Sequence, residues 1–212
     1  IIVKQRDVVG NIMQEWIEGW LKKNGIDYSL NDNTQMPPDF YLDPDNKTEG
    51  LMEIKAFNYK GSPGFDIADF RMYEREIAQK PWMLNVTYLV FGYDMAEDGT
   101  VTIKKVWQKK VWEMSRPMKS GKSKTIWPIN LQIKQGTVHK MRPAKWYGKQ
   151  TAFSIYDCLE DFLSAMEETM YKNKDTRDDA PDWLQKVLDN YEKHYGVRLQ
   201  IPRWNDIASK YV

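Results

Sequence analysis

The chain has 212 residues, a formal net charge of +1 and 42% apolar residues, which suits one globular domain with a well-filled core. No stretch approaches the roughly 18 uninterrupted apolar residues of a membrane span, and no signal-peptide pattern opens the chain, so we expect a cytoplasmic protein without membrane contact. A single cysteine, Cys158, excludes an internal disulfide, and only His139 and His194 accompany it, which argues against a Cys/His zinc site. The same scarcity argues against histidine-metal nuclease motifs and Ser-His-Asp triads.

The near-neutral total hides a strongly basic central segment. Residues 104–149 contain thirteen Lys or Arg and one acid, Glu113, whereas residues 1–103 and 150–212 both carry net negative charge. Charge segregated in this way produces a positive face, whose usual partner is a polyanion such as nucleic acid. The alternative is a solvated surface whose lysines serve only solubility.

The first half of the chain predicts the order helix, three strands, helix, two strands. Apolar residues at three- and four-residue spacing predict a first helix over residues 6–24, which ends at Asn24-Gly25. A second helix is expected over residues 66–79. The expected strands cover residues 26–30, 40–42, 51–57, 86–91 and 101–107.

The second half predicts a basic loop, a hairpin and two helices. Residues 117–124 read as a flexible basic loop, and residues 131–141 as a hairpin around Gln135-Gly136. Helices are expected over residues 154–171 and 182–195, the latter ending at Gly196.

Two carboxylates and a lysine stand out in the first half, in Pro38-Asp39 and Glu53-Ile54-Lys55. The side-chain period of two places Glu53 and Lys55 on one face of the third strand and Ile54 in the core. If the second and third strands form a hairpin, Asp39 and Glu53 converge within reach of one metal ion, and the Ile54 carbonyl offers a further oxygen. Oxygen ligands suit Mg²⁺.

Lys55, beside such a metal, can orient or deprotonate a water molecule and neutralise developing charge. The arrangement therefore favours metal-dependent hydrolysis of a phosphodiester. The alternative is a surface hairpin in which Glu53 and Lys55 are merely exposed partners on an amphipathic strand.

With these motifs and this order of elements, residues 6–93 resemble the PD-(D/E)xK nuclease superfamily. The resemblance implies an α/β, restriction-endonuclease-like core with a central mixed β-sheet flanked by helices, to which a β-hairpin region and C-terminal helices are added. It implies that Asp39 and Glu53 are metal ligands and Lys55 the catalytic lysine, with Mg²⁺ as cofactor, Mn²⁺ as a substitute and 5′-phosphate ends as product. Many members add an acid from the first helix, for which Glu15 is the candidate.

Within the superfamily, the compact size and the basic second half resemble a type II restriction endonuclease. The run from Phe65 to Arg71 is similar to the NgoBV/NlaIV-like group. This implies a homodimer acting on double-stranded DNA, encoded by a bacterium, an archaeon or a phage. The expected organisation is a single nuclease domain over residues 1–212: a catalytic core (1–95), a basic strand and hairpin region (96–150) and C-terminal helices (151–212).

Two other functions remain open at this point. One is a nuclease of the same fold that recognises DNA structure in repair or phage recombination. The other is a non-catalytic nucleic-acid-binding protein in which the motif is accidental, although Asp39, Glu53 and Lys55 are all intact.

The basic segment offers both kinds of DNA contact. Base edges suit the residues that form paired hydrogen bonds with guanine or adenine, here Arg116, Gln132 and Arg142. Phosphates suit the lysines Lys119, Lys122, Lys124, Lys134, Lys140 and Lys145.

Aromatic and acidic residues near the basic segment have two readings each. The interleaved tryptophans Trp107, Trp112, Trp127 and Trp146 stack on unpaired bases or, as we expect, form the apolar underside of strands. Asp66, Asp69 and Arg71 approach the substrate, or they cap the second helix and form salt bridges on it.

Overall fold

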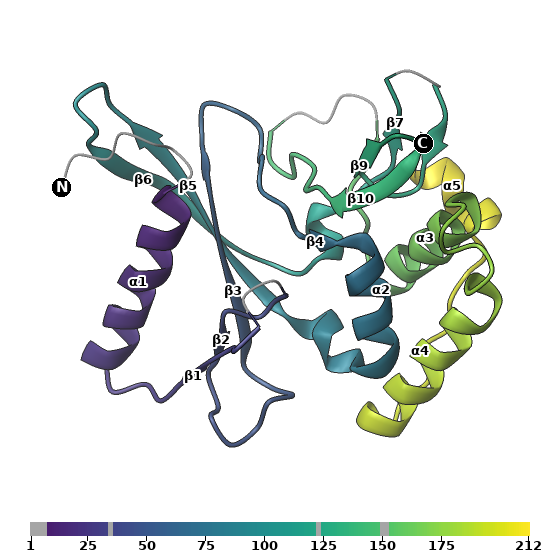
Figure 1. Ribbon diagram of the computed structural model, residues 1–212, viewed down its shortest axis with the longest axis horizontal. Coiled ribbons are helices and arrows are strands. Elements are labelled where there is room, and N and C mark those ends of the chain that lie inside the picture. Colours follow the sequence, from purple (N-terminus) through teal and green to yellow (C-terminus); the bar gives the residue numbers. More distant parts are fainter. Residues whose placement is uncertain (1–7, 34–35, 122–123, 149–152) are drawn as a thin grey trace. The chain divides into compact units, whose positions relative to one another are not determined.

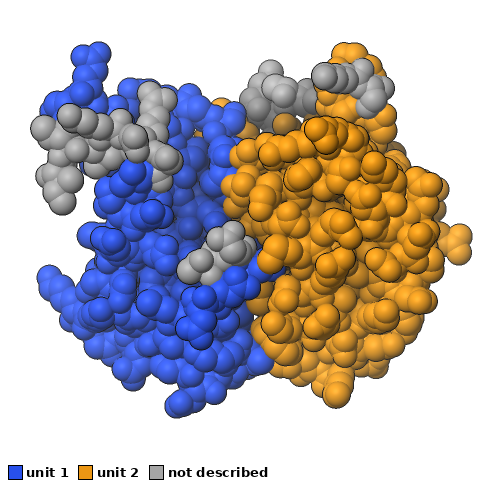
Figure 2. All heavy atoms as spheres, in the orientation of Figure 1, with its two compact units in different colours: residues 1–65, 85–110 blue, residues 66–84, 111–212 orange. Residues whose placement is uncertain are grey.

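The computed structural model describes residues 8–33, 36–121, 124–148 and 153–212, which form helices and strands (Figure 1). Contacts divide the chain into two compact units, each built from two separate sequence segments (Figure 2). Unit 1 consists of residues 1–65 and 85–110; unit 2 consists of residues 66–84 and 111–212.

These boundaries differ from the three consecutive regions expected from the sequence. Residues 66–84, expected in the catalytic core, cluster with unit 2, and residues 96–110, expected with the basic hairpin, cluster with unit 1. The reason for the second difference is strand pairing, because the strand that follows residue 100 completes the sheet of unit 1.

In its described residues, unit 1 contains a mixed five-stranded sheet and one α-helix. Its elements are α1 (Val8–Lys23), β1 (Ser29–Leu30), β2 (Phe40–Tyr41), β3 (Leu51–Asn58), β5 (Thr87–Met95) and β6 (Val101–Lys109). The strand order is β1-β2-β3-β5-β6. β3 and β5 are parallel and the other neighbours are antiparallel, so the predicted mixed sheet is present.

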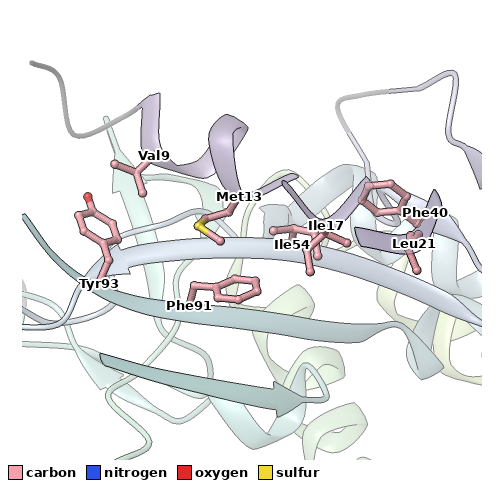
Figure 3. Packing of buried hydrophobic residues seen from close by; sticks show 8 residues of the cluster. All are labelled: Val9, Met13, Ile17, Leu21, Phe40, Ile54, Phe91 and Tyr93. Carbon is pink, nitrogen blue, oxygen red and sulfur yellow. The ribbon is translucent and has the colours of Figure 1, made fainter. Parts of the chain in front are cut away.

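Helix α1 packs against one face of this sheet. Every fourth residue from Val9 to Leu21 forms its buried stripe. This stripe meets Phe40 of β2, Ile54 of β3, and Phe91 and Tyr93 of β5 (Figure 3). A second apolar flank of α1 stays exposed, with Trp16 at 56% of its possible surface. Beside it, Val106 of β6 is exposed to 50%.

In the part of unit 2 that the structure describes, short strands are combined with four α-helices. Its elements are β4 (Ala68–Asp69), α2 (Phe70–Gln79), β7 (Met118–Lys119), β8 (Ile126–Trp127), β9 (Leu131–Lys134), β10 (Thr137–Met141), α3 (Leu159–Lys172), α4 (Ala180–Tyr195) and α5 (Trp204–Tyr211). β4, β10 and β9 form one antiparallel sheet in that order, and β7 pairs with β8. Two short 3-10 helices cover Pro81–Asn85 and Trp112–Met114.

Several predicted boundaries in unit 2 are wrong. The second helix begins at Phe70 and not at residue 66, because Ala68 and Asp69 pair with β10 and the Asp69 side chain then caps the helix by accepting the Met72 N–H at 3.1 Å. The predicted basic loop contains β7, and α3 starts at Leu159 instead of residue 154.

The predicted hairpin over residues 131–141 is confirmed as β9 and β10, and α4 ends at Gly196 as expected, where a φ of 71° provides the left-handed cap. Helix α5 was not predicted. In the described parts of the chain, no helix has the length and apolar character needed to cross a bilayer.

Candidate active site

The hairpin of β2 and β3 brings the two motif carboxylates together. Its antiparallel register pairs Tyr41 with Leu51 and Phe40 with Met52. The next position in that register places Asp39 opposite Glu53, where side chains on antiparallel strands come within roughly 5 Å at their Cβ atoms. Two residues far apart in the printed sequence therefore meet because the hairpin is in this register.

Beyond Met52, the edge of β3 that faces β2 has no further strand pairing among the described residues. Ile54 turns its N–H to this edge and donates it to Asp39 Oδ2 at 2.7 Å. The N–H and C=O of one strand residue point to the same edge, so the Ile54 carbonyl faces the same way. Its side chain points instead into the core beneath α1 (Figure 3).

Glu53 is a buried acid with a lysine beside it. Only 5% of the residue is exposed, and its Oε1 lies 2.6 Å from Lys55 Nζ. Burial raises the pKa of Glu53 to about 7, against the opposing effect of the Lys55 charge and with a further rise from the Asp39 charge. Burial also raises the pKa of Asp39, while the Ile54 N–H and Lys55 act in the opposite direction.

The donor atoms at this site suit a hard divalent cation. Glu53 Oε2 is buried and has no hydrogen-bond partner among the described residues. An unsatisfied buried carboxylate oxygen is costly unless something positive binds it. With Asp39 and the Ile54 carbonyl, it makes an all-oxygen donor set of the kind that Mg²⁺ prefers. No group of three or more His, Cys, Asp or Glu forms a denser metal cluster in the described chain.

A cavity of about 600 Å³ opens beside these groups, entirely within unit 1. Its walls come from α1, the open edge of β3 and the loop after β3. The loop contributes a glycine-rich stretch that includes Gly61, Ser62 and Gly64. Asp39, Glu53 and Lys55 all line the cavity, so the three motif residues open into one space.

Glu15, the candidate from the first helix, is not in the cavity wall and its side chain is exposed. The α1 residues that line the cavity are Gly10, Asn11 and Gln14. The apolar stripe of a helix tells which side faces the sheet but not which of its two polar flanks faces the cavity, and Glu15 lies on the wrong flank. Asn11 and Gln14 were therefore missed, and no sequence pattern distinguishes them from ordinary surface amides.

Of the nine residues expected to contact DNA, eight lie in the described part of unit 2, and Lys122 lies outside the described residues. Lys119 is exposed on β7 and Lys134 on β9. Gln132 lies on β9 and Lys124 follows β7 with a positive φ of 58°. Lys119, Gln132 and Lys134 therefore belong to the two small sheets of the unit, and Lys124 precedes β8.

The remaining basic residues of this group have partners. Arg142 Nε lies 3.0 Å from Asp66 Oδ1, and Lys140 lies 3.9 Å from Asp69. Lys145 lies over the Tyr147 ring, and Arg116 donates to the Phe153 carbonyl, so cations expected at DNA are also tied to the protein.

The tryptophans of the basic segment pack against the protein. Trp127 is 9% exposed. Trp107 stacks on Phe57 with ring centroids 5.8 Å apart and an interplanar angle of 19°. The expectation that these rings form the apolar underside of strands fits both positions.

Comparison with known proteins agrees with the motif. Residues 1–211 match the model of the NgoBV restriction endonuclease family. The type II restriction enzyme NlaIV of Neisseria lactamica is 54% identical over 212 residues, which cover all of this chain and 85% of that enzyme. The type II restriction enzyme NgoBV of Neisseria gonorrhoeae is 49% identical over 135 residues, or 64% of this chain and 73% of that enzyme.

A solved structure, described as NlaIV restriction endonuclease, superimposes with a TM-score of 0.93 at 54% identity and covers all of this chain and 84% of that one. The predicted restriction-endonuclease-like α/β fold and the resemblance to the NgoBV/NlaIV-like group are confirmed by these matches.

Proposed function

Because the chain belongs to the NgoBV restriction endonuclease family, we propose that the cavity beside β3 is the active site of a type II enzyme that cuts double-stranded DNA at a specific short sequence. The observation that carries this assignment is the convergence of Asp39, Glu53 and Lys55 at the open edge of β3. A surface hairpin would leave Glu53 solvated, whereas it is 5% exposed with an unpaired buried oxygen.

Asp39, Glu53 and the Ile54 carbonyl are the proposed ligands of Mg²⁺, for which Mn²⁺ can substitute. Bound there, the cation would stabilise charge on the phosphate and lower the pKa of a coordinated water. Two features support binding of Mg²⁺ at this site: all the donor atoms are oxygens, and Glu53 Oε2 has no hydrogen-bond partner within the part of the chain that the structure describes. Glu15 is not part of this proposal, because it does not reach the cavity.

Lys55 has the central protein role in the proposed reaction. Its Nζ, 2.6 Å from Glu53 Oε1, orients the attacking water and neutralises negative charge that builds on the phosphate. Water attacks phosphorus, the bond to the 3′ oxygen breaks, and the products carry a 5′-phosphate and a 3′-hydroxyl.

Unit 2 is the proposed main DNA-holding part. Its exposed lysines would contact phosphates, while Arg116, Gln132 and Arg142 would reach base edges. The ion pair with Asp66 holds the Arg142 guanidinium in place before DNA binds. This supports a role in base contact, because a side chain that is already fixed loses less entropy on binding.

We also propose a homodimer that works in the bacterial cytoplasm. A two-fold assembly presents one active site to each strand of a symmetric DNA site. The exposed apolar flank of α1 and β6 in unit 1, with Trp16 and Val106, supports association of some kind. Sedimentation equilibrium that finds only monomer at all concentrations, with and without DNA, would contradict the dimer.

The experiment is incubation of supercoiled plasmid with the full chain in Mg²⁺ or in EDTA, followed by sequencing of the cut ends. Discrete fragments with a common flanking sequence, 5′-phosphate ends and no cutting in EDTA are expected. Lys55→Ala should bind but not cut. Smears or cuts only at junctions would indicate a structure-specific nuclease of the same fold, and binding without cutting under every condition would indicate a non-catalytic DNA-binding protein.

A further inference from the structure

A group of three lysines gathers in unit 1, outside the residues so far assigned to DNA. Lys60 follows the catalytic strand β3, and Lys104 and Lys105 lie on β6. All three are exposed, Lys60 with 73% of its side-chain surface. We call Lys60, Lys104 and Lys105 the unit 1 lysine cluster.

Strand register places Lys105 of this cluster on the catalytic face of the sheet. Phe57 of β3 pairs with Gly92 of β5, and Gly92 pairs with Lys105 of β6. Phe57 shares a face with Glu53 and Lys55 because it follows them at the strand period of two. Two strand spacings across and two residues along separate Lys105 from Lys55, a Cα separation of roughly 12 Å.

Aromatic packing fixes this separation. The Trp107 ring stacks on Phe57 and also contacts Tyr59, with centroids 6.0 Å apart. It lies directly over Gly92, where a Cβ atom would come within 2.9 Å of the indole. The glycine permits the close approach, and the stacked rings tie the end of β3 to β6. The lysines therefore stand on the same packed body as the proposed catalytic residues.

The cluster keeps a net positive charge. The acid that pairs with it is Asp94, whose Oδ1 lies 2.8 Å from Lys60 Nζ. The hydrogen bond from Lys60 chiefly, with the charges of Lys60 and Lys104 in addition, lowers the pKa of Asp94, so this acid is ionised at neutral pH. Its single negative charge does not balance the charges of three lysines.

A competing explanation is that edge strands carry lysines to prevent pairing with other sheets, and β6 is an edge strand. The distribution of side chains argues against this as the whole explanation. Lys104 is the extra residue at an irregularity in β6, next to Lys105. Its charge helps to lower the pKa of Asp94, a β5 residue on the catalytic face. The β6 residues that line a hollow together with α1 are apolar: Val101, Ile103 and Val106. Lysines that served only as edge protection would have no reason to gather on one face.

We propose that Lys60, Lys104 and Lys105 bind backbone phosphates of the DNA strand that is cut, within a few nucleotides of the scissile phosphate. Each strand of B-DNA carries a phosphate about every 3.4 Å of helix axis, so a cation roughly 12 Å from Lys55 meets a neighbouring one. The inference rests on the proposed function and deepens it, because it gives the cutting unit its own hold on the substrate.

The test is the salt dependence of DNA binding by the full chain in EDTA, where no cutting occurs. The double variant Lys104→Ala/Lys105→Ala should bind a short duplex less tightly and flatten the plot of log affinity against log salt by about 1.8, because each phosphate that is no longer neutralised reduces the slope by about 0.9. Duplexes of unrelated sequence should show the same change, because phosphates carry no sequence information. Lys104→Arg/Lys105→Arg should retain the wild-type slope.

Lys23→Ala is the matched control, an exposed lysine of unit 1 in the last turn of α1. It should leave both slope and affinity unchanged. Lys60→Ala tests the third cation separately and should flatten the slope by about 0.9.

An unchanged slope in the double variant and in Lys60→Ala, with a wild-type chain that binds and cuts DNA, overturns the inference and leaves the proposed function intact. A slope that falls equally in Lys23→Ala overturns it as well. A wild-type chain that neither binds nor cuts DNA would contradict both the proposed function and this inference.

Discussion

Two buried glutamates, one in each unit, have the same raised pKa but very different surroundings. Burial raises the pKa of both Glu53 and Glu74 to about 7. Glu53 has Lys55 at 2.6 Å, Asp39 opposite in the hairpin and a cavity of about 600 Å³. Glu74, on α2, has Arg75 at 3.6 Å and a cavity of about 310 Å³ between α2 and α4.

Around Glu74, polar side chains of α4 form hydrogen bonds with main-chain carbonyls of α2. The indole Nε1 of Trp183 donates to the Glu74 carbonyl at 2.8 Å, and Asn190 donates to the Ala78 carbonyl at 2.7 Å. Both hydrogen bonds join α4 to the main chain of α2, so they hold two helices together. The contrast teaches that a raised pKa marks burial, and that a catalytic proposal needs convergent groups in addition.

The largest expected difference is in cleavage. Glu53→Gln should lower the rate of DNA cutting by on the order of 10³-fold, because it removes a charge that holds the cation and Lys55. Glu74→Gln should cut at close to the wild-type rate. Single-turnover rates on one duplex at saturating Mg²⁺ measure both. Equal reductions in the two variants would remove the distinction between the sites.

A stability experiment should measure what it costs the folded protein to ionise Glu74. Between pH 4.5 and about 7, folded Glu74 keeps a proton that the unfolded chain has released, so the free energy of unfolding falls as pH rises through this range. Glu74→Gln cannot ionise and should be more stable than wild type at pH 8 by about 1 to 3 kcal/mol. Urea unfolding at pH 5 and pH 8 gives the difference; parallel changes in both proteins contradict the assignment.

Trp183→Phe should lower the stability of the protein, because the contacts around Glu74 join two helices. It keeps an aromatic ring but leaves the Glu74 carbonyl without its donor, at a cost of about 1 to 2 kcal/mol in stability. Cleavage per folded molecule should be retained. Thermal unfolding together with single-turnover cutting at low temperature checks this, and a loss of cutting without a loss of stability would place the region in the reaction.

The smallest effect concerns the DNA-holding part of unit 2. Lys119→Ala removes one exposed cation from β7 and should flatten the salt dependence of DNA binding by about 0.9. The measurement is affinity for a short duplex over a range of salt concentrations. A slope equal to that of wild type takes β7 out of the DNA interface.

Elements whose signal lies within a short stretch of sequence were predictable. The stripe from Val9 to Leu21 predicted α1, and alternation over residues 51–57 predicted β3, because both patterns arise from one core face. The motif at Asp39, Glu53 and Lys55 predicted a meeting that the hairpin register produces. Their catalytic role stays a prediction.

Features that depend on distant partners were not predictable. Ala68 and Asp69 look like the start of a helix, but their strand pairing comes from β10, far along the chain. Helix α5 has eight residues, too few for a stable isolated helix. The Tyr211 hydroxyl attaches it to α3 by a hydrogen bond to Asp161 at 2.6 Å, and nothing local announces such a contact.

The division of the chain into interleaved segments has a consequence for the integrity of the protein. The backbone passes from one unit to the other after residues 65, 84 and 110. No single cut therefore separates the two units cleanly: residues 1–110 contain all of unit 1 but also the 66–84 segment of unit 2, and residues 66–212 contain all of unit 2 but also the 85–110 segment of unit 1. The part that we expect to hydrolyse DNA can be released intact only with a segment of the other unit attached, and the unit left behind is then missing that segment.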